Sequence, residues 1–151
     1  MLIMKNIIIE VPASSDFAEL VSVWEASVRA THDFLKEEDI QFYKPLILNE
    51  YLKAVNLYCI KTDNGAIAGF MGLGEDSIEM LFIHPSFRGS GIGKALLLFA
   101  VNDQKITKVD VNEQNDQATG FYAKMGFAVT GRSDLDGMGK PYPILHMELA
   151  G

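Results

Sequence analysis

Apolar residues recur at helical spacing in two segments of the first third of the chain. The first segment follows Asp16 and reaches about Ala30. Its apolar stripe consists of Phe17, Leu20, Val21, Trp24 and Val28. Asp16 and Glu19 have the spacing of a capping box, which predicts the start of a helix. The second segment covers 38–53, where Pro45 is expected to disturb the helix because proline has no backbone N–H.

Shorter apolar runs bounded by turn residues predict strands. Asn64-Gly65 is a two-residue hairpin signal between two of them. Strands are expected at 2–11, 57–61, 66–73, 77–83, 108–111, 127–132 and 144–149. Two further helices are expected at 91–101 and 117–125. This order predicts one domain over residues 1–151, of the α/β class, in which about four helices flank a mixed central sheet of about seven strands.

Composition narrows the function classes. The chain has 151 residues, 48% of them hydrophobic and 22% charged, which is normal for a globular domain. Its net charge of -7 disfavours nucleic acid as a partner, and its apolar runs are too short to span a bilayer. The only cysteine, Cys59, stands in an apolar strand and is expected to pack, and His32, His84 and His146 lack metal-ligand spacing. We therefore expect a cytoplasmic protein with no metal, no nucleic-acid partner and no membrane partner.

A glycine-rich loop connects the strand at 77–83 to the helix at 91–101. Glycines at alternate positions let backbone N–H groups approach a ligand closely, and the following helix adds free amides and the positive end of its dipole. Such a site suits a pyrophosphate. The loop consists of Arg88, Gly89, Ser90, Gly91, Ile92, Gly93 and Lys94.

Neither common phosphate motif fits this loop. The dinucleotide-binding fingerprint would need glycine where Lys94 stands. The P-loop would need glycine in place of Arg88, and Ser or Thr in place of Ala95. The spacing alone therefore leaves open a glycine-rich turn that binds no ligand.

A second motif follows the strand at 108–111. Asn115 precedes a helical face, and Gly126 is a natural C-cap residue. The face consists of Ala118, Phe121, Tyr122 and Met125. Core packing explains Phe121 and Met125, whereas a buried Tyr122 hydroxyl needs a partner, so a structural and a functional role stay open for Tyr122.

Taken together, the two motifs resemble those of the GNAT superfamily of N-acetyltransferases. The phosphate loop of that family, Arg/Gln-x-x-Gly-x-Gly/Ala, matches residues 88–93. Its later motif, Asn-x-x-Ala-x-x-Phe-Tyr-x-x-x-Gly-Phe, matches residues 115–127 at every marked position. The stretches 30–35 and 139–143 are similar to a bacterial subgroup, the YjaB-like acetyltransferases. The resemblance covers nearly the whole chain and implies a GNAT-like fold.

The resemblance implies an N-acetyltransferase that moves the acetyl group of acetyl-CoA directly to a primary amine of an unidentified small molecule or peptide. The backbone of Leu81, Phe82 and Ile83 would pair with the pantetheine arm, and the loop at 88–94 would hold the pyrophosphate. A main-chain N–H near Leu81 would stabilise the charge that develops on the carbonyl oxygen. Asn115 would hydrogen-bond the cofactor near its thioester.

Two residues are candidates for proton transfer. The resemblance puts Tyr122 beside the sulfur, and a phenol with a pKa of about 10 can protonate a leaving thiolate whose thiol has a pKa of about 8.5. Glu79 is expected to share a strand face with Leu81 and to act as the base, directly or through water. Alternation along the strand puts Ile78 and Met80 on the opposite face. The alternative for Glu79 is a carboxylate that is merely solvated.

The sequence says least about which residues bind the acceptor. His32, Asp33 and Tyr142 are candidates for binding the amine, and His146 is a further one, with packing as the alternative for each. The protein is expected to be a monomer or a homodimer. Three rival functions remain: a sensor that binds acyl-CoA without turnover, an acyltransferase for longer acyl chains or alcohols, and a protein–protein adaptor.

Overall fold

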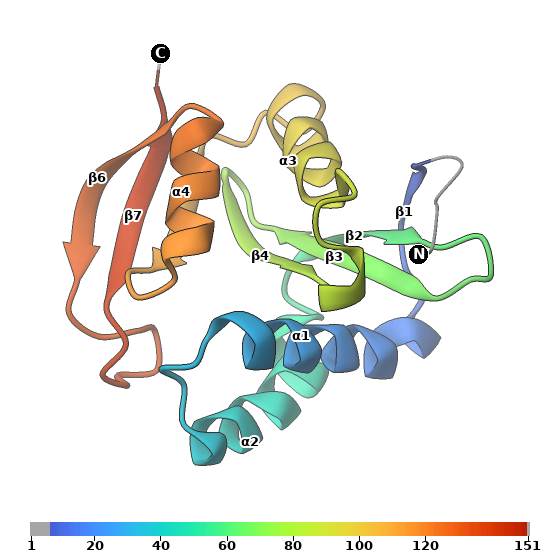
Figure 1. Ribbon diagram of the computed structural model, residues 1–151, viewed down its shortest axis with the longest axis horizontal. Coiled ribbons are helices and arrows are strands. Elements are labelled where there is room, and N and C mark those ends of the chain that lie inside the picture. Colours follow the sequence, from blue (N-terminus) through green and yellow to red (C-terminus); the bar gives the residue numbers. More distant parts are fainter. Residues whose placement is uncertain (1–6, 151) are drawn as a thin grey trace.

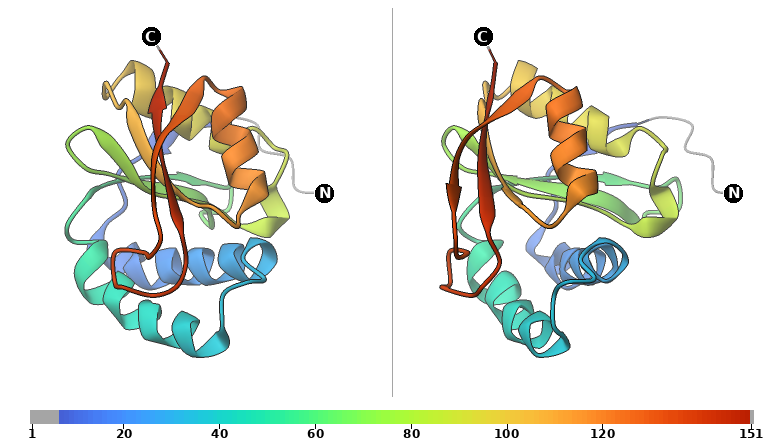
Figure 2. Two further views of the ribbon diagram at one scale, coloured as in Figure 1. Left: turned by 90° about the vertical axis from the view of Figure 1, so that its left-hand side faces the viewer. Right: turned by 60° about the vertical axis from the view of Figure 1, so that its left-hand side comes forward.

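The computed structural model describes residues 7–150 of the chain. The strands are β1 (Ile9–Glu10), β2 (Asn56–Lys61), β3 (Ile67–Leu73), β4 (Ser77–Ile83), β5 (Lys108–Asn112), β6 (Phe127–Ser133) and β7 (Ile144–Leu149). The helices are α1 (Phe17–Thr31), α2 (Glu37–Leu46), α3 (Ile92–Asn102) and α4 (Asp116–Lys124). The strands form one mixed sheet in the order β1-β2-β3-β4-β5-β7-β6. Helices α1 and α2 lie on one face, and α3 and α4 lie on the other (Figures 1 and 2), which confirms the expected class of fold.

Two elements differ from the expected bounds. The strand expected at 2–11 includes residues 2–6, which lie outside the described residues, and β1 covers Ile9–Glu10. The helix expected at 38–53 ends as an α-helix at Leu46 and continues as a π-helical turn over Ile47–Tyr51. This change comes just after Pro45. Proline supplies no backbone N–H to the α-helical hydrogen bonds, which is the physical reason for the change.

The expected capping box at the start of α1 is wrong. The Asp16 carboxylate accepts a hydrogen bond from the Ala13 N–H at 2.9 Å and does not cap an amide of α1. The Glu19 carboxylate instead accepts a hydrogen bond from the Ile67 N–H of β3 at 2.7 Å. This contact joins α1 to the sheet, so a tertiary partner has replaced the local one.

Two apolar clusters fill the space between the sheet and its helices. The cluster on the side of α3 and α4 includes Leu96, Val109 and Tyr122, and the cluster on the side of α1 and α2 includes Trp24 and Cys59. Cys59 is fully buried, and burial raises the pKa of its thiol to about 11, which fits the packing role expected for it. None of the described helices is both long and apolar enough to cross a membrane.

Among the strands of residues 7–150, β4 and β5 are the parallel pair, and they separate after two residue pairs. The pairs are Ser77 with Lys108 and Ile78 with Val109. Beyond them β4 continues to Ile83 and β5 to Asn112 without further pairing between the two strands. The edge of β4 that faces β5 therefore has unpaired backbone groups over its second half.

Candidate active site

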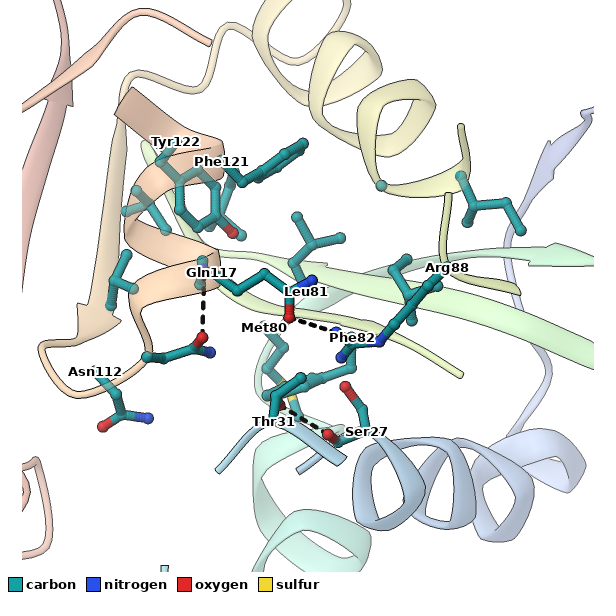
Figure 3. Close-up of a pocket in the computed structure, with 18 of the residues that line it drawn as sticks. Ser27, Thr31, Met80, Leu81, Phe82, Arg88, Asn112, Gln117, Phe121 and Tyr122 are labelled. Atoms are coloured by element: carbon teal, nitrogen blue, oxygen red, sulfur yellow. Dashed lines mark hydrogen bonds between the residues drawn. The ribbon is translucent and has the colours of Figure 1, made fainter. Parts of the chain in front are cut away.

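A cavity of about 440 Å³ opens where β4 and β5 separate. Its wall comes from the end of α1, from β4 and β5, from the glycine loop and from α4 (Figure 3). The candidate site residues that line it are His32, Glu79, Leu81, Phe82, Ile83, Arg88, Gly89, Gly91, Ile92, Gly93, Lys94, Asn115 and Tyr122. The structure thus brings together most residues that the sequence singled out. Ser90, Asp33, Tyr142 and His146 are not part of this wall.

The glycine loop presents backbone amides to the cavity. Gly89 and Gly91 have φ values of 77 and 86, a left-handed conformation that glycine adopts without strain. The first α-helical hydrogen bond of α3 runs from the Ala95 N–H to the Gly91 carbonyl at 2.9 Å. The N–H groups of the preceding residues, 92–94, have no partner inside the helix and lie at the positive end of its dipole. This end of the cavity can therefore bind an anion.

A β-bulge changes the faces of β4. Leu73 pairs with Ile78 and Gly72 pairs with Met80, so Glu79 is an extra residue on β4. Ile78 consequently packs in the cluster beside α3 and α4, whereas Met80 packs in the cluster beside α1 and α2. The strict alternation expected from the sequence, with Ile78 and Met80 on one face, is wrong.

Glu79 is exposed at this bulge and lines the cavity. Its carboxylate accepts a hydrogen bond from the Ser77 hydroxyl at 2.5 Å. The extra residue also interrupts the ladder between β3 and β4 at the point where β5 separates from β4. The bulge therefore puts a carboxylate in the cavity wall at the point where β4 and β5 separate.

Tyr122 projects from α4 into the cleft between α4 and β4 (Figure 3). Its ring packs edge-on against Phe121 and Phe127, with centroid distances of 5.2 and 5.8 Å. The side chain is 6% exposed, and burial raises its pKa above the ordinary value for a phenol. The hydroxyl is therefore protonated at neutral pH and available as a proton donor to a group in the cavity.

Two polar side chains at the start of α4 have partners that the sequence did not reveal. Asn115 is the N-cap residue of α4, and its side chain accepts a hydrogen bond from the Ala118 N–H at 3.1 Å. The Arg88 guanidinium donates to the Gln117 side-chain oxygen at 2.5 Å and so crosses from the glycine loop to α4 (Figure 3). Asn115 consequently keeps its amide nitrogen for a ligand, since the cap uses its oxygen.

His32 ends α1 at the cavity wall. Its Nδ1 lies 2.7 Å from the Thr31 hydroxyl, which in turn donates to the Ser27 carbonyl at 2.8 Å. Burial is the main cause that lowers the His32 pKa to about 4, and the positive charge of Arg88 acts in the same direction. The imidazole is therefore neutral at pH 7.

Tyr142 has a different place from the one expected. It is 6% exposed, and its hydroxyl donates to the Asp39 carboxylate and accepts a hydrogen bond from the Lys36 N–H at 3.3 Å. Lys140 adds an ion pair to Asp39 at 3.0 Å. These contacts join the loop between β6 and β7 to the start of α2, so the hydroxyl of Tyr142 is used in packing two segments together.

Sequence reasoning missed five polar residues of the cavity wall: Ser27, Thr31, Asp110, Asn112 and Gln117. Asp110 and Asn112 alternate with the buried Val109 and Val111 along β5. This alternation was a readable signal for a half-buried strand with a polar face.

Comparison with known proteins identifies the class. The family model described as "Acetyltransferase (GNAT) domain" matches residues 29–148. The chain therefore belongs to the GNAT family of acetyltransferases, and it is an acetyl-transferring enzyme of the N-acetyltransferase type.

Two named relatives and two solved structures narrow the comparison. The chain is 44% identical over 129 residues to the peptidyl-lysine N-acetyltransferase YjaB of Salmonella typhimurium, covering 85% of this chain and 88% of the relative. It is 42% identical over 133 residues to YjaB of Escherichia coli, covering 88% and 90%. The solution structure of apo-form YjaB from Escherichia coli superimposes with a TM-score of 0.87 at 40% identity, over 97% of this chain and 99% of that one. PaiA N-acetyltransferase from Thermoplasma acidophilum, in complex with coenzyme A, gives a TM-score of 0.74 at 25% identity, over 97% and 99%.

Proposed function

We propose that this acetyltransferase moves the acetyl group of acetyl-CoA directly to the ε-amino group of a lysine in a peptide or protein. The observation that carries the proposal is the continuity of the cavity, from the free amides of α3, along the unpaired edge of β4, to Tyr122. The names of the YjaB relatives support lysine as the acceptor. The expectations of a cytoplasmic enzyme that acts as a monomer or a homodimer remain part of the proposal.

The residues present fit a CoA-type ligand at three places. The amides of residues 92–94 would hold the pyrophosphate, with the side chains of Arg88 and Lys94 adding positive charge beside it. The unpaired backbone of Leu81, Phe82 and Ile83 would pair with the pantetheine arm as an added strand does. Asn115 would donate from its amide nitrogen near the thioester.

Tyr122 would supply the proton for the departing sulfur. The thioester supplies an activated acyl group. Burial raises the pKa of Tyr122, and it would also raise the pKa of a thiol bound beside it. The two acidities therefore stay comparable, as they are in water. Tyr122 would then recover a proton from solvent.

Glu79 would accept the proton from the amine, directly or through one water. It lies in the cavity wall where β4 and β5 begin to separate, and its carboxylate accepts a hydrogen bond from Ser77. His32 would line the path of the acceptor as a neutral imidazole. Asp33 keeps only the role that the sequence suggested, since it lies outside the cavity wall.

The proposal is tested in two measurements on the full chain. Calorimetry with coenzyme A should show binding, and release of CoA thiol from acetyl-CoA should be observed with a lysine-containing peptide. The matched control is the same peptide with its lysine blocked by Nε-acetylation, which should give no release. Binding of coenzyme A without release from any of a panel of amines would favour the sensor and overturn the enzyme proposal.

A variant pair tests the base in the same assay. Glu79→Gln keeps the shape of the side chain but removes its charge, and kcat should fall at least tenfold with the KM for acetyl-CoA unchanged. Ser77→Ala removes only the hydrogen bond to Glu79 and should have a smaller effect. Unchanged kcat in Glu79→Gln would remove Glu79 as the base.

A further inference from the structure

Asp110, His146 and Ser133 form a hydrogen-bonded chain across the three C-terminal strands. Asp110 of β5 faces His146 of β7 in register, with its carboxylate oxygen Oδ1 2.7 Å from His146 Nδ1. On the other side of the ring, Nε2 lies 2.7 Å from the Ser133 hydroxyl of β6. The imidazole is therefore hydrogen-bonded through both of its nitrogens, and it orients the Asp110 carboxylate, whose side chain is 63% exposed.

Asp110 is the member of this hydrogen-bonded group that reaches the cavity. Asp110 lines the cavity and directly follows Val109, which belongs to the last residue pair of β4 and β5. Val109 and Val111 are buried on the side of α3 and α4, so Asp110 projects from the opposite face of β5. It thus lies across the gap from the bulge at Glu79.

The charge at Asp110 is not neutralised by a lysine or arginine among the described residues. Its Oδ1 pairs with His146, and no hydrogen bond from a described residue reaches its Oδ2. Lys108, two residues earlier on the same face, pairs with Asp76 at 3.4 Å. A carboxylate at the end of a cavity, with one oxygen oriented and the other available, suits a cation that can donate a hydrogen bond.

We propose that Asp110 binds the ammonium group of the acceptor amine, and that His146 and Ser133 are positioning residues for its carboxylate. The class of acceptor is a primary ammonium, and this assignment rests on the function proposed above. The order Ser-His-Asp is also that of a nucleophilic triad, but Ser133 lies outside the cavity wall, away from any bound acyl group. Asp110 is therefore a binding group, which brings the amine to the end of the cavity where Glu79 lies.

Four variants test this with a lysine peptide as the acceptor. Asp110→Asn should raise the KM for the peptide about fivefold and leave the KM for acetyl-CoA and the melting temperature unchanged, because the charge of a largely exposed carboxylate is lost. His146→Leu should raise the same KM about threefold or more. His146→Asn, which keeps a donor near the position of Nδ1, should recover most of this loss. The control is Glu148→Gln, which removes a carboxylate from the neighbouring strand β7. Glu148 lies beside Asp110 and His146 but outside the cavity, so the KM for the peptide should stay within twofold of the wild type.

A binding measurement separates this proposal from the proposed function. The probe is Nα-acetyl-lysine methyl ester, added to the protein–CoA complex while the ring proton signals of His146 are followed by NMR. The probe should shift these signals in the wild type and not in Asp110→Asn. Such shifts without transfer to any amine would sink the proposed function and keep the ammonium site. Transfer that Asp110→Asn leaves unchanged, or wild-type signals that do not move, would overturn the ammonium site.

Discussion

The Tyr142 hydroxyl donates a hydrogen bond to the Asp39 carboxylate, and this contact ties the loop between β6 and β7 to the first turn of α2. Lys140 of the same loop pairs with Asp39 and lies over the Phe42 ring, 4.4 Å from its centroid. The Tyr43 hydroxyl donates to Asp136, also in this loop. Four contacts therefore attach the loop to α2.

Tyr142→Phe removes one of these contacts and should lower the melting temperature by about 3 °C or more, because a buried hydrogen bond to a charged group is lost. At a temperature where the variant is folded, kcat and the KM for the acceptor should stay close to the wild-type values, since Tyr142 does not line the cavity. Tyr58→Phe is the matched control, because no described residue hydrogen-bonds the Tyr58 hydroxyl, and it should melt like the wild type. A large rise in the KM for the acceptor, without a change in melting temperature, would instead return Tyr142 to the acceptor site.

Tyr122→Phe should keep the affinity for coenzyme A and lower kcat at least tenfold, because the ring still packs but the proton donor is gone. Calorimetry gives the affinity, and thiol release gives the rate. Because burial raises the pKa of Tyr122, its ionisation should cause no loss of kcat between about pH 7 and 9. A variant with the wild-type rate would exclude Tyr122 as the acid.

Gly91→Ala should weaken coenzyme A binding at least tenfold and destabilise the fold by about 1–2 kcal/mol, because alanine at a φ of 86 is strained. An added Cβ at Gly91 meets no atom within 4 Å, so the expected effect comes from the backbone and not from a clash. Gly120→Ala inside α4 also meets nothing within 4 Å and should be neutral or stabilising. Equal behaviour of the two variants in calorimetry and thermal melting would contradict the role given to the loop.

Acidification should destabilise the wild type more than His32→Asn. The His32 pKa is lowered to about 4 in the folded chain, so between about pH 6.5 and 4 the unfolded chain binds the additional proton and stability falls as the pH falls. Between pH 7 and 5 this histidine should contribute a loss of about 1–2 kcal/mol. The measurement is the difference in unfolding free energy between the two pH values, in which constant effects of the substitution cancel. An equal difference in both proteins would show that His32 is not buried as a neutral ring.

Local motifs made the glycine loop and the start of α4 predictable. The left-handed residues Gly89 and Gly91 and the capping residue Asn115 depend on a few neighbouring residues, and such short-range geometry is readable from spacing. The bounds of the flanking helices followed for the same reason. Most of the cavity wall, and with it the family, was therefore accessible from the sequence.

Contacts between residues far apart in the sequence could not be predicted from local spacing. The bulge at Glu79 depends on the register of β4 with β3. Glu19 accepts a hydrogen bond from the N–H of Ile67, 48 residues away, and does not form the expected capping box. Tyr142 found its partner 103 residues away, and His146 and Asp110 are 36 residues apart. Periodicity reports which face a residue takes in a regular element, but it does not report which partner the fold brings to that face.

The short pairing of β4 with β5 divides the sheet into two plates. Strands β1–β4 form one ladder and β5–β7 form the other, and two residue pairs are the main-chain seam between them. Side-chain contacts connect the two parts of the sheet elsewhere. Arg88 donates a hydrogen bond to Gln117 on one side, and Tyr142 of the loop between β6 and β7 donates one to Asp39 of α2 on the other. The width of the opening is consequently set by a few side chains that take no part in the proton transfers. Substitutions at these spans can change the size of acceptor that enters while every reacting group stays in place.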